Sequence, residues 1–232
     1  MQQFTTLIRS DKEYRAFLDT LCETYKKKDT PLPIAVNGLS GGAEWAFLTE
    51  SVREICAQGP TLCLVCDEGE RERLTRELNL GGIRARGFKL REPVYYNLAA
   101  SHEVDRERLS VLADVLEGKL DCVVATAAAA FSLTMPKDTL SKLTLEFSLG
   151  DELGPEALMK KLSALGFNYA DAVEGKGQYA KRGGIVDFWC EDYESPVRVE
   201  FFGDEIDRIS EINALTGMAE RYIDHVAIYP AS

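Results

Sequence analysis

Short apolar runs alternate with segments of helical periodicity along the first half of the chain. The runs predicted to be strands lie at residues 32–36, 61–66, 84–88 and 121–125. The segments between them repeat apolar residues every three or four positions, which predicts helices at about 10–28, 43–57, 69–79 and 104–117. Short apolar strands separated by helices are typical of a parallel sheet with helices on both faces. The first half is therefore predicted to be an α/β domain.

Residues that favour helix ends support two of these helices. Ser10 and Glu13 have the spacing of a capping box, in which each side chain accepts a hydrogen bond from a backbone N–H at the start of a helix. Gly59 and Pro60 are expected to end the helix predicted at residues 43–57.

The second half is predicted to be rich in strands after one further helix. Pro155 near its start and Gly166 after its end bracket the helix "PEALMKKLSAL". The stretches "QYAKRGGIVDFW" and "PVRVEFF" predict strands, and Gly203-Asp204 predicts a tight hairpin turn into "EIDRISEI". Because side chains alternate along a strand, the valines of "VRVEFF" and its first phenylalanine share one face, and Arg198 points to the other.

A glycine-rich turn follows the first predicted strand, where a nucleotide-binding chain carries its phosphate loop. That loop requires Gly, four residues, and then Gly-Lys-Ser/Thr. Counted from Gly38, the last three positions hold Ala43, Glu44 and Trp45. Glu44 stands at the position of the Lys, so attraction for the phosphate is replaced by repulsion. Two unit charges roughly 4 Å apart repel each other by about 4 kcal/mol at an effective dielectric near 20. Trp45 removes the hydroxyl that holds Mg²⁺. The turn is either a degenerate phosphate loop or an ordinary strand-to-helix turn, and in both cases we expect no productive ATP binding.

The charge of the chain weighs against a nucleic-acid-binding function. The formal net charge is −11, from 27 Lys and Arg against 38 Asp and Glu, whereas nucleic-acid binding depends largely on neutralising phosphates. The stretch Arg71–Arg91 is locally basic. It is either an ordinary solvated surface or a docking surface for an acidic partner.

Catalytic and metal-binding patterns are missing from the sequence. It contains neither HExxH nor GxSxG, and His102 and His225 have no partners at ligand spacing. Cys63 and Cys66 have CxxC spacing, but an odd separation in a strand points them to opposite faces, which favours structural cysteines. We therefore expect no catalytic residue, no cofactor and no metal.

Signals of a membrane or secreted protein are also missing. No apolar run reaches the roughly 18 residues that span a bilayer, and "MQQFTTLIRS" lacks the apolar core of a signal peptide. Six cysteines in 232 residues do not make a disulfide scaffold. The expected location is the cytoplasm, without membrane contact.

Several strings resemble a known repair module. "GFNYADAVEGKGQYAKRGGIVDFW", "PVRVEFFGDEIDRISEINALTG" and "VAIYPAS" resemble the module shared by the bacterial transcription-repair coupling factors (Mfd) and the excision-repair protein UvrB. "NGLSGGAEWAFL" looks like the inactive phosphate loop of the coupling factors, whereas UvrB keeps an intact Gly-Lys-Ser/Thr. "SHEVDRERLSVLADVLEGKLDCVVATAAAAF" is similar to a stretch of both families. The resemblance covers nearly the whole chain, and the lost Lys favours the coupling factor.

The resemblance implies an α/β fold in three parts. Residues 1–135 would form a degenerate P-loop (RecA-like) parallel-sheet domain similar to UvrB domain 1a. Residues 136–218 would form a small mixed α/β module similar to UvrB domain 2, which interacts with UvrA. Residues 219–232 would begin the returning segment similar to domain 1b. A change of composition and period near residues 132–142 agrees with the first boundary.

The resemblance also implies a function. The chain would be a non-catalytic N-terminal module that recruits UvrA to a stalled RNA polymerase. It would be a fragment of a longer ATP-dependent DNA translocase whose downstream domains are further partners, and RNA polymerase and DNA would be reached only through the parent protein. The alternative is a divergent UvrB-like repair protein that binds ATP or DNA.

The UvrA-binding residues implied by the resemblance lie around the RGG string. They are Arg182, Lys181, Gly183, Gly184, Tyr179, Tyr169 and Arg198. Tyr169 stands where the family commonly has an Arg, and Tyr supplies aromatic area but not the charge-assisted fork of Arg.

Other interpretations of these residues stay open. Gly183 and Gly184 would also suit a bulge in a strand. Arg182 and Arg198 would also suit surface ion pairs with Glu200 or Asp187, each worth about 0–1 kcal/mol.

Overall fold

The computed structural model describes residues 8–26, 33–39, 43–91 and 103–230. The chain divides into two compact units, one made of residues 1–88 and 117–130 and the other of residues 89–116 and 131–232. Segment 89–116 therefore interrupts the first unit in sequence but belongs to the second.

The first unit contains a small parallel sheet. Its elements are α2 (Lys12–Lys26), α3 (Ala43–Ile55), the 3-10 helix η1 (Cys56–Gln58), β1 (Thr61–Val65), α4 (Glu68–Leu80), β2 (Ala85–Phe88), β3 (Cys122–Thr126) and α6 (Ala127–Phe131). The strands lie in the order β1-β3-β2, with Cys122 of the central strand paired to Thr61 on one side and to Ala85 on the other. The predicted parallel sheet is confirmed.

Helix α4 forms the core of this unit with the sheet. Leu74 and Leu78, four residues apart on α4, lie in one buried cluster with Cys122 and Val124 of β3. Side chains at this spacing share a face of a helix, so the apolar stripe of α4 packs on the central strand. Leu62 and Leu64 of β1 are 55% and 53% exposed, and the expectation that both faces of the sheet are covered does not hold for this strand.

Two local predictions at the start of the chain are wrong. The described part of the predicted strand at residues 32–36 has no regular structure, and Pro33 lacks the N–H that a strand ladder requires. Asp11 rather than Ser10 caps α2, because the Asp11 carboxylate accepts hydrogen bonds from the backbone N–H groups of Glu13 and Tyr14, at 2.9 Å each.

The second unit is dominated by strands, as predicted. Its elements are α5 (Glu103–Leu116), α7 (Lys137–Leu143), β4 (Leu145–Ser148), α8 (Pro155–Ala164), β5 (Asn168–Tyr169), β6 (Gln178–Arg182), β7 (Ile185–Trp189), β8 (Val197–Phe202), β9 (Glu205–Ile212), β10 (Ala219–Tyr222) and β11 (His225–Ile228). Six strands form one sheet in the order β10-β9-β8-β7-β6-β5, antiparallel except for the β5–β6 pair. β11 returns to pair with β4, with Val226 opposite Phe147.

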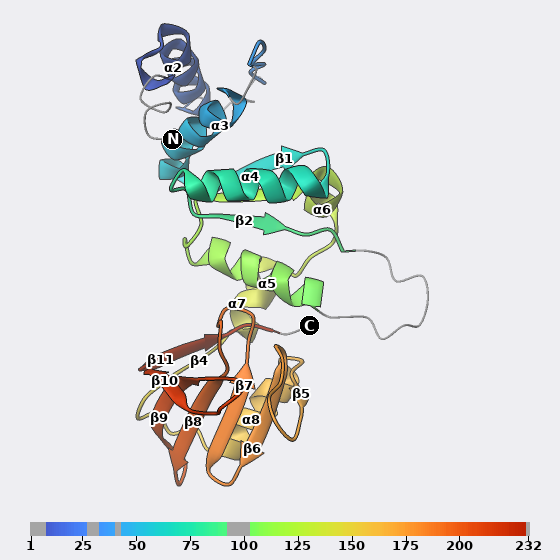
Figure 1. Ribbon diagram of the computed structural model, residues 1–232, viewed down its shortest axis with the longest axis vertical. Coiled ribbons are helices and arrows are strands. Elements are labelled where there is room, and N and C mark those ends of the chain that lie inside the picture. The colour runs from blue at the N-terminus through green and yellow to red at the C-terminus, as the bar shows by residue number, and fades with distance from the viewer. Residues whose placement is uncertain (1–7, 27–32, 40–42, 92–102, 231–232) are drawn as a thin grey trace, which may run out of the picture. The chain divides into compact units, whose positions relative to one another are not determined.

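Helix α8 covers one face of the six-stranded sheet (Figure 1). Leu158 and Leu162, four residues apart on α8, are fully buried in one cluster with Val186, Phe188 and Val199. Every second residue of β7 and β8 thus enters the core, which is the alternation the sequence predicted. We call the face away from α8 the open face.

Helix α5 is part of the second unit. Leu109 and Ala113 of α5 are buried in a cluster with Leu140 of α7 and with Tyr229. Sequence analysis placed this helix in the segment 1–135, whereas its contacts group it with the strand-rich unit. The predicted domain boundaries at residues 135 and 218 stay a prediction.

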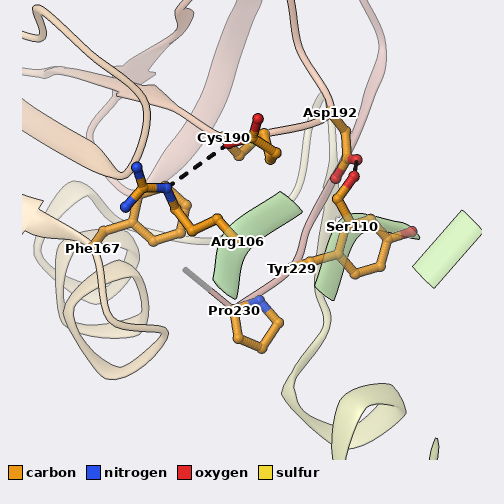
Figure 2. Close-up of a pocket in the computed structure, with 8 residues that line it drawn as sticks. Arg106, Ser110, Phe167, Cys190, Asp192, Tyr229 and Pro230 are labelled. Carbon is orange, nitrogen blue, oxygen red and sulfur yellow. Dashed lines mark hydrogen bonds and ion pairs between the residues drawn. The ribbon is translucent and has the colours of Figure 1, made fainter. Parts of the chain in front are cut away.

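Polar contacts also fasten α5 to the strand-rich unit. Figure 2 shows Ser110 and Arg106 of α5 lining a small cavity with Cys190 and Asp192. The Ser110 hydroxyl forms a hydrogen bond with the Asp192 carboxylate, and Arg106 Nε lies 3.8 Å from Glu191 Oε2. The loop after β7 is therefore tied to α5 by charge as well as by packing.

The start of α4 gives a test of the first unit. The Asp67 carboxylate accepts from the N–H of Glu70 at 2.8 Å, and the Glu70 carboxylate accepts from the N–H of Cys66 at 3.0 Å. Asp67→Ala should lower the free energy of unfolding by about 1 kcal/mol, the usual loss for an N-cap, and Asp67→Asn should lose much less because it keeps an acceptor. Urea denaturation measures both. Equal losses for the two variants would contradict this role of Asp67.

Candidate interaction site at one end of the six-stranded sheet

Two hairpin turns project from the same end of the six-stranded sheet. β6 and β8 both run antiparallel to β7, so the β6–β7 turn and the β8–β9 turn lie at the same end. The first turn is Arg182–Ile185 and the second is Phe202–Glu205, and the outer residues of each are paired. We call these two turns the hairpin end.

Each turn begins with a glycine in the left-handed region. Gly183 has a φ of 61° and Gly203 a φ of 65°, a conformation that two-residue hairpin turns often need and that glycine adopts without a Cβ penalty. The predicted tight turn at Gly203-Asp204 is confirmed. Gly183-Gly184 form a turn rather than a bulge, and the register of the β8–β9 pair shifts instead between Glu200 and Phe201, where Asp207 of β9 is skipped.

The strand register places Arg182 on the open face. Arg182 is paired with Ile185, which is paired in turn with Glu200, so the three side chains form a row across β6, β7 and β8. The neighbouring row contains Val186 and Val199, which are fully buried beneath α8. Arg182 therefore points away from the core.

Three other predicted residues lie on the side of α8. Lys181 forms an ion pair with Glu156 of α8, and this contact lowers the pKa of the Glu156 carboxyl. Tyr179 belongs to the core cluster, and Tyr169 is paired beside it on β5, with 5.6 Å between their ring centroids. The residues predicted to form one site are thus divided between the two faces of the sheet.

Arg182 differs from the other arginines on the strands of this sheet. The paired ones are Arg198 with Asp187, Arg208 with Glu200 and Arg221 with Glu211. Arg182 is exposed, and its side chain has no hydrogen bond or ion pair with any residue in the described part of the chain. A guanidinium carries five N–H donors, so Arg182 can offer a full fork to a carboxylate of another molecule.

Arg198 is bound within the module. Two of its nitrogens donate to the two carboxylate oxygens of Asp187, at 2.8 Å each, and a third donates to the carbonyl oxygen of Gly217 at 2.9 Å. The hydrogen bond with Asp187 raises the pKa of Arg198. This is the pairing with Asp187 that the sequence left open, and a role for Arg198 in partner binding stays a prediction.

Phe202 is a residue of the hairpin end that the sequence analysis did not select. Its side chain is 82% exposed. Phe201 packs against the core cluster, so the next residue along the strand points to the open face. The alternation that assigns Arg198 and Glu200 to this face would have assigned Phe202 to it as well.

The residues at the phosphate-loop positions have other roles in the described structure. Ala43 and Glu44 are exposed in the first turn of α3, where the carboxylate of Glu44 suits the positive end of the helix dipole. Trp45 packs against the core cluster of the first unit, and the guanidinium of Arg73 lies 4.7 Å from its ring centroid. Gly38 has a φ of 86°, and residues 40–42 of the loop lie outside the described residues.

The locally basic stretch 71–91 is largely neutralised within the unit to which each part belongs. Its ion pairs are Arg71 with Glu68, Arg84 with Asp121, Lys89 with Glu107 and Arg91 with Asp105. This pattern favours an ordinary charged surface over a docking surface for an acidic partner.

The remaining features that the sequence analysis considered are the CxxC string, metal ligands and membrane-spanning helices. Cys63 lies beside the core with its sulfur 3.5 Å from that of Cys122, whereas Cys66 is exposed, so the two cysteines of the CxxC string point apart as predicted. Among the residues that the structure describes, no group of three His, Cys, Asp or Glu side chains is arranged to hold a metal ion. No helix within the described ranges is both long and apolar enough to cross a membrane.

The different surroundings of Arg198 and Arg182 predict effects of different size on stability when each is replaced by Ala. Arg198→Ala should lower the free energy of unfolding by about 1–3 kcal/mol, because it leaves the largely buried Asp187 carboxylate unpaired. Arg182→Ala should change it by less than about 0.5 kcal/mol, as is usual for exposed residues. Thermal and urea denaturation of the two variants tests this. Loss of stability in Arg182→Ala would make Arg182 a structural residue.

Comparisons with known proteins agree with the resemblance seen in the sequence. Residues 145–232 match the family model of the UvrB interaction domain. The UvrABC system protein B of Enterococcus faecalis is 37% identical over 131 residues, which are 56% of this chain and 20% of that protein. The transcription-repair-coupling factor of Bacillus subtilis is 25% identical over 234 positions, which cover 100% of this chain and 19% of that protein.

The chain thus spans about a fifth of the length of these relatives. The hairpin end lies inside the matched segment, as does the whole six-stranded sheet. Residues 145–232 are therefore similar to the UvrB interaction domain, in a chain that is similar to the transcription-repair coupling factor along its entire length.

Proposed function

We propose that this chain is the UvrA-binding part of a transcription-repair coupling factor and acts in nucleotide excision repair by protein–protein contact. The observation that carries the proposal is the exposed and unpaired Arg182 at the hairpin end of a UvrB interaction domain. Arginine is among the residues that most often dominate binding energy at interfaces. Burying the Arg182 side chain against a partner costs less than burying one of the paired arginines, because no contact inside the described module has to be broken.

The charge distribution favours a protein partner with carboxylates over DNA. The chain carries a net charge of −11, and the other arginines on the strands of the module are paired with carboxylates. A DNA phosphate backbone would meet repulsion from most of the surface, whereas a single carboxylate of a partner could pair with the Arg182 guanidinium at short range.

The role in the parent protein follows from the relatives. We propose that the module brings UvrA to a stalled RNA polymerase, and that contacts with the polymerase and with DNA, as well as ATP-driven translocation, belong to the rest of the parent protein. Similarity to a coupling factor over the whole chain supports this assignment over a UvrB-like protein, to which the match covers 56% of the chain.

We also propose that the chain binds no nucleotide and needs no cofactor. Glu44 places a negative charge on the helix N-terminus that a phosphate would occupy, and Trp45 is packed into the first unit. Both features oppose phosphate binding by electrostatics and by bulk.

The binding role of Arg182 can be measured with purified UvrA. Arg182→Ala should weaken the complex by about 2 kcal/mol, or roughly 30-fold, which is the range of an interface hot spot. Arg182→Lys should fall between, because it keeps the charge and loses the fork. Arg221→Ala on the edge strand β10 is the matched control and should bind like the wild type. Unchanged affinity in Arg182→Ala would refute this site.

The absence of nucleotide binding can be tested by isothermal titration calorimetry. ATP and ADP, each with and without Mg²⁺, should give no binding heat at millimolar ligand. The reason is the charge reversal at Glu44, which costs about 4 kcal/mol for a phosphate charge at roughly 4 Å. A micromolar dissociation constant for either nucleotide would restore the alternative of a divergent ATP-binding repair protein.

A further inference from the structure

Two thiols that no sequence spacing links lie next to each other in the first unit. The Sγ of Cys63 on β1 is 3.5 Å from the Sγ of Cys122 on β3, which comes 59 positions later in the chain. Cys66, the other cysteine of the CxxC string, follows the end of β1 and is exposed. The partner of Cys63 in the folded chain is therefore Cys122 and not Cys66.

The two thiols differ in their access to solvent. Cys122 is 0% exposed and belongs to the cluster that contains Leu74 and Leu78 of α4. Cys63 packs against this cluster from β1, an edge strand of the parallel sheet, and stays partly exposed. A small reagent from solvent therefore reaches Cys63 before it reaches Cys122.

The contact between the sulfurs also makes the two thiols chemically unequal. The Cys122 S–H donates to the Cys63 sulfur, and this hydrogen bond lowers the pKa of Cys63 and raises the pKa of Cys122. Burial raises the pKa of Cys56 and of Cys190. Because the thiolate is the form of cysteine that attacks an electrophile, Cys63 is more reactive than these three.

The strand register shows how the pair fits a disulfide bond. β1 and β3 are parallel, with Cys63 opposite Val124 and Cys122 opposite Thr61, so the two cysteines are diagonal neighbours. Their sulfurs have to approach from 3.5 Å to about 2 Å to form the bond. A bond between diagonal positions pulls on the ladder between the strands, and a strained disulfide is readily reduced again.

We propose that Cys63 and Cys122 form a reversible redox pair, with hydrogen peroxide as the oxidant and glutathione as the reductant. The Cys63 thiolate attacks one oxygen of the peroxide, the O–O bond breaks, and Cys63 becomes a sulfenic acid as hydroxide leaves. The Cys122 sulfur then attacks the Cys63 sulfur and gives up its proton, and the S–O bond breaks to release water. Two thiols and one peroxide thus become one disulfide and two waters. Two molecules of glutathione restore the thiols and leave as glutathione disulfide.

The arrangement has the parts of a thiol sensor. Such sensors combine an accessible cysteine of lowered pKa with a second cysteine that resolves the sulfenic acid, and these are the roles of Cys63 and Cys122. Disulfides in cytoplasmic proteins are usually transient and redox-sensing, and the cytoplasm is the location expected from the sequence. The bond would join the edge strand β1 to the central strand β3. It concerns the first unit alone and does not depend on binding of UvrA.

The experiment treats the full chain with hydrogen peroxide at low protein concentration, isolates the monomer by gel filtration and counts free thiols with N-ethylmaleimide in denaturant. The chain has six cysteines, so the reduced protein should take six labels and the oxidised protein four. Peptide mapping by mass spectrometry should assign the bond to Cys63 and Cys122. An excess of reduced glutathione should restore six labels.

Variants and a denatured sample control for other pairings. Cys66→Ser is the matched control and should form the same bond as the wild type. Cys122→Ser should lose the bond, and dimedone should then trap Cys63 as a sulfenic acid. In the wild type oxidised in urea, the share of the Cys63–Cys122 bond among all disulfides should fall at least about 5-fold, because the fold no longer holds the sulfurs together.

Four results would overturn the redox pair. They are six labels after peroxide treatment, a bond from Cys63 to Cys66 in place of Cys122, a bond that excess glutathione fails to open, and an equal share of the bond in the folded and the unfolded chain. If Cys122→Ser does not fold, the mapped bond and its change in urea still decide the question, because both are measured on the wild type.

Discussion

Burial of one face of the six-stranded sheet beneath α8 is the constraint on which the rest of the module depends. Side chains of a strand alternate between faces, so a slip of β6 by one residue would turn Arg182 toward α8 and move Tyr179 out of the core. Losing the burial of one such aromatic ring costs about 1.5–3 kcal/mol. The apolar residues of β6 and β7 thus keep Arg182 on the face away from α8.

On the open face, ion pairs inside the module determine which arginine side chains can bind a partner without losing another contact. The guanidinium of Arg198 donates to both Asp187 and the carbonyl of Gly217. A partner could therefore bind it only by leaving a largely buried carboxylate unpaired. The side chain of Arg182 has no such contact with any of the described residues. Two arginines that look alike in the sequence therefore differ in their surroundings, because one strand position faces a buried aspartate and the other ends at a turn.

The sequence predicted elements well where the signal was local. The parallel strands β1, β2 and β3, helix α8 and the Gly203-Asp204 turn follow from apolar runs, end residues and turn glycines. The β11–β4 pair joins segments far apart in the sequence, and no local pattern in the sequence predicts this pairing. The grouping of α5 with the strand-rich unit rests on Ser110, Arg106 and Leu109, whose partners lie far away in the sequence. For the site, periodicity placed Arg198 on the correct face but could not show that Asp187 holds it.

The division of the predicted site between two faces changes the meaning of Tyr169. The resemblance placed Tyr169 where related chains commonly have an Arg, as a second anchor beside Arg182. Tyr169 instead stacks edge-on against Tyr179 on the side of α8, at the edge strand β5. A partner centred on the open face would reach it only around that edge. The two predicted anchors, Arg182 and Tyr169, therefore lie on opposite faces of the sheet, and a role for Tyr169 in partner binding stays a prediction.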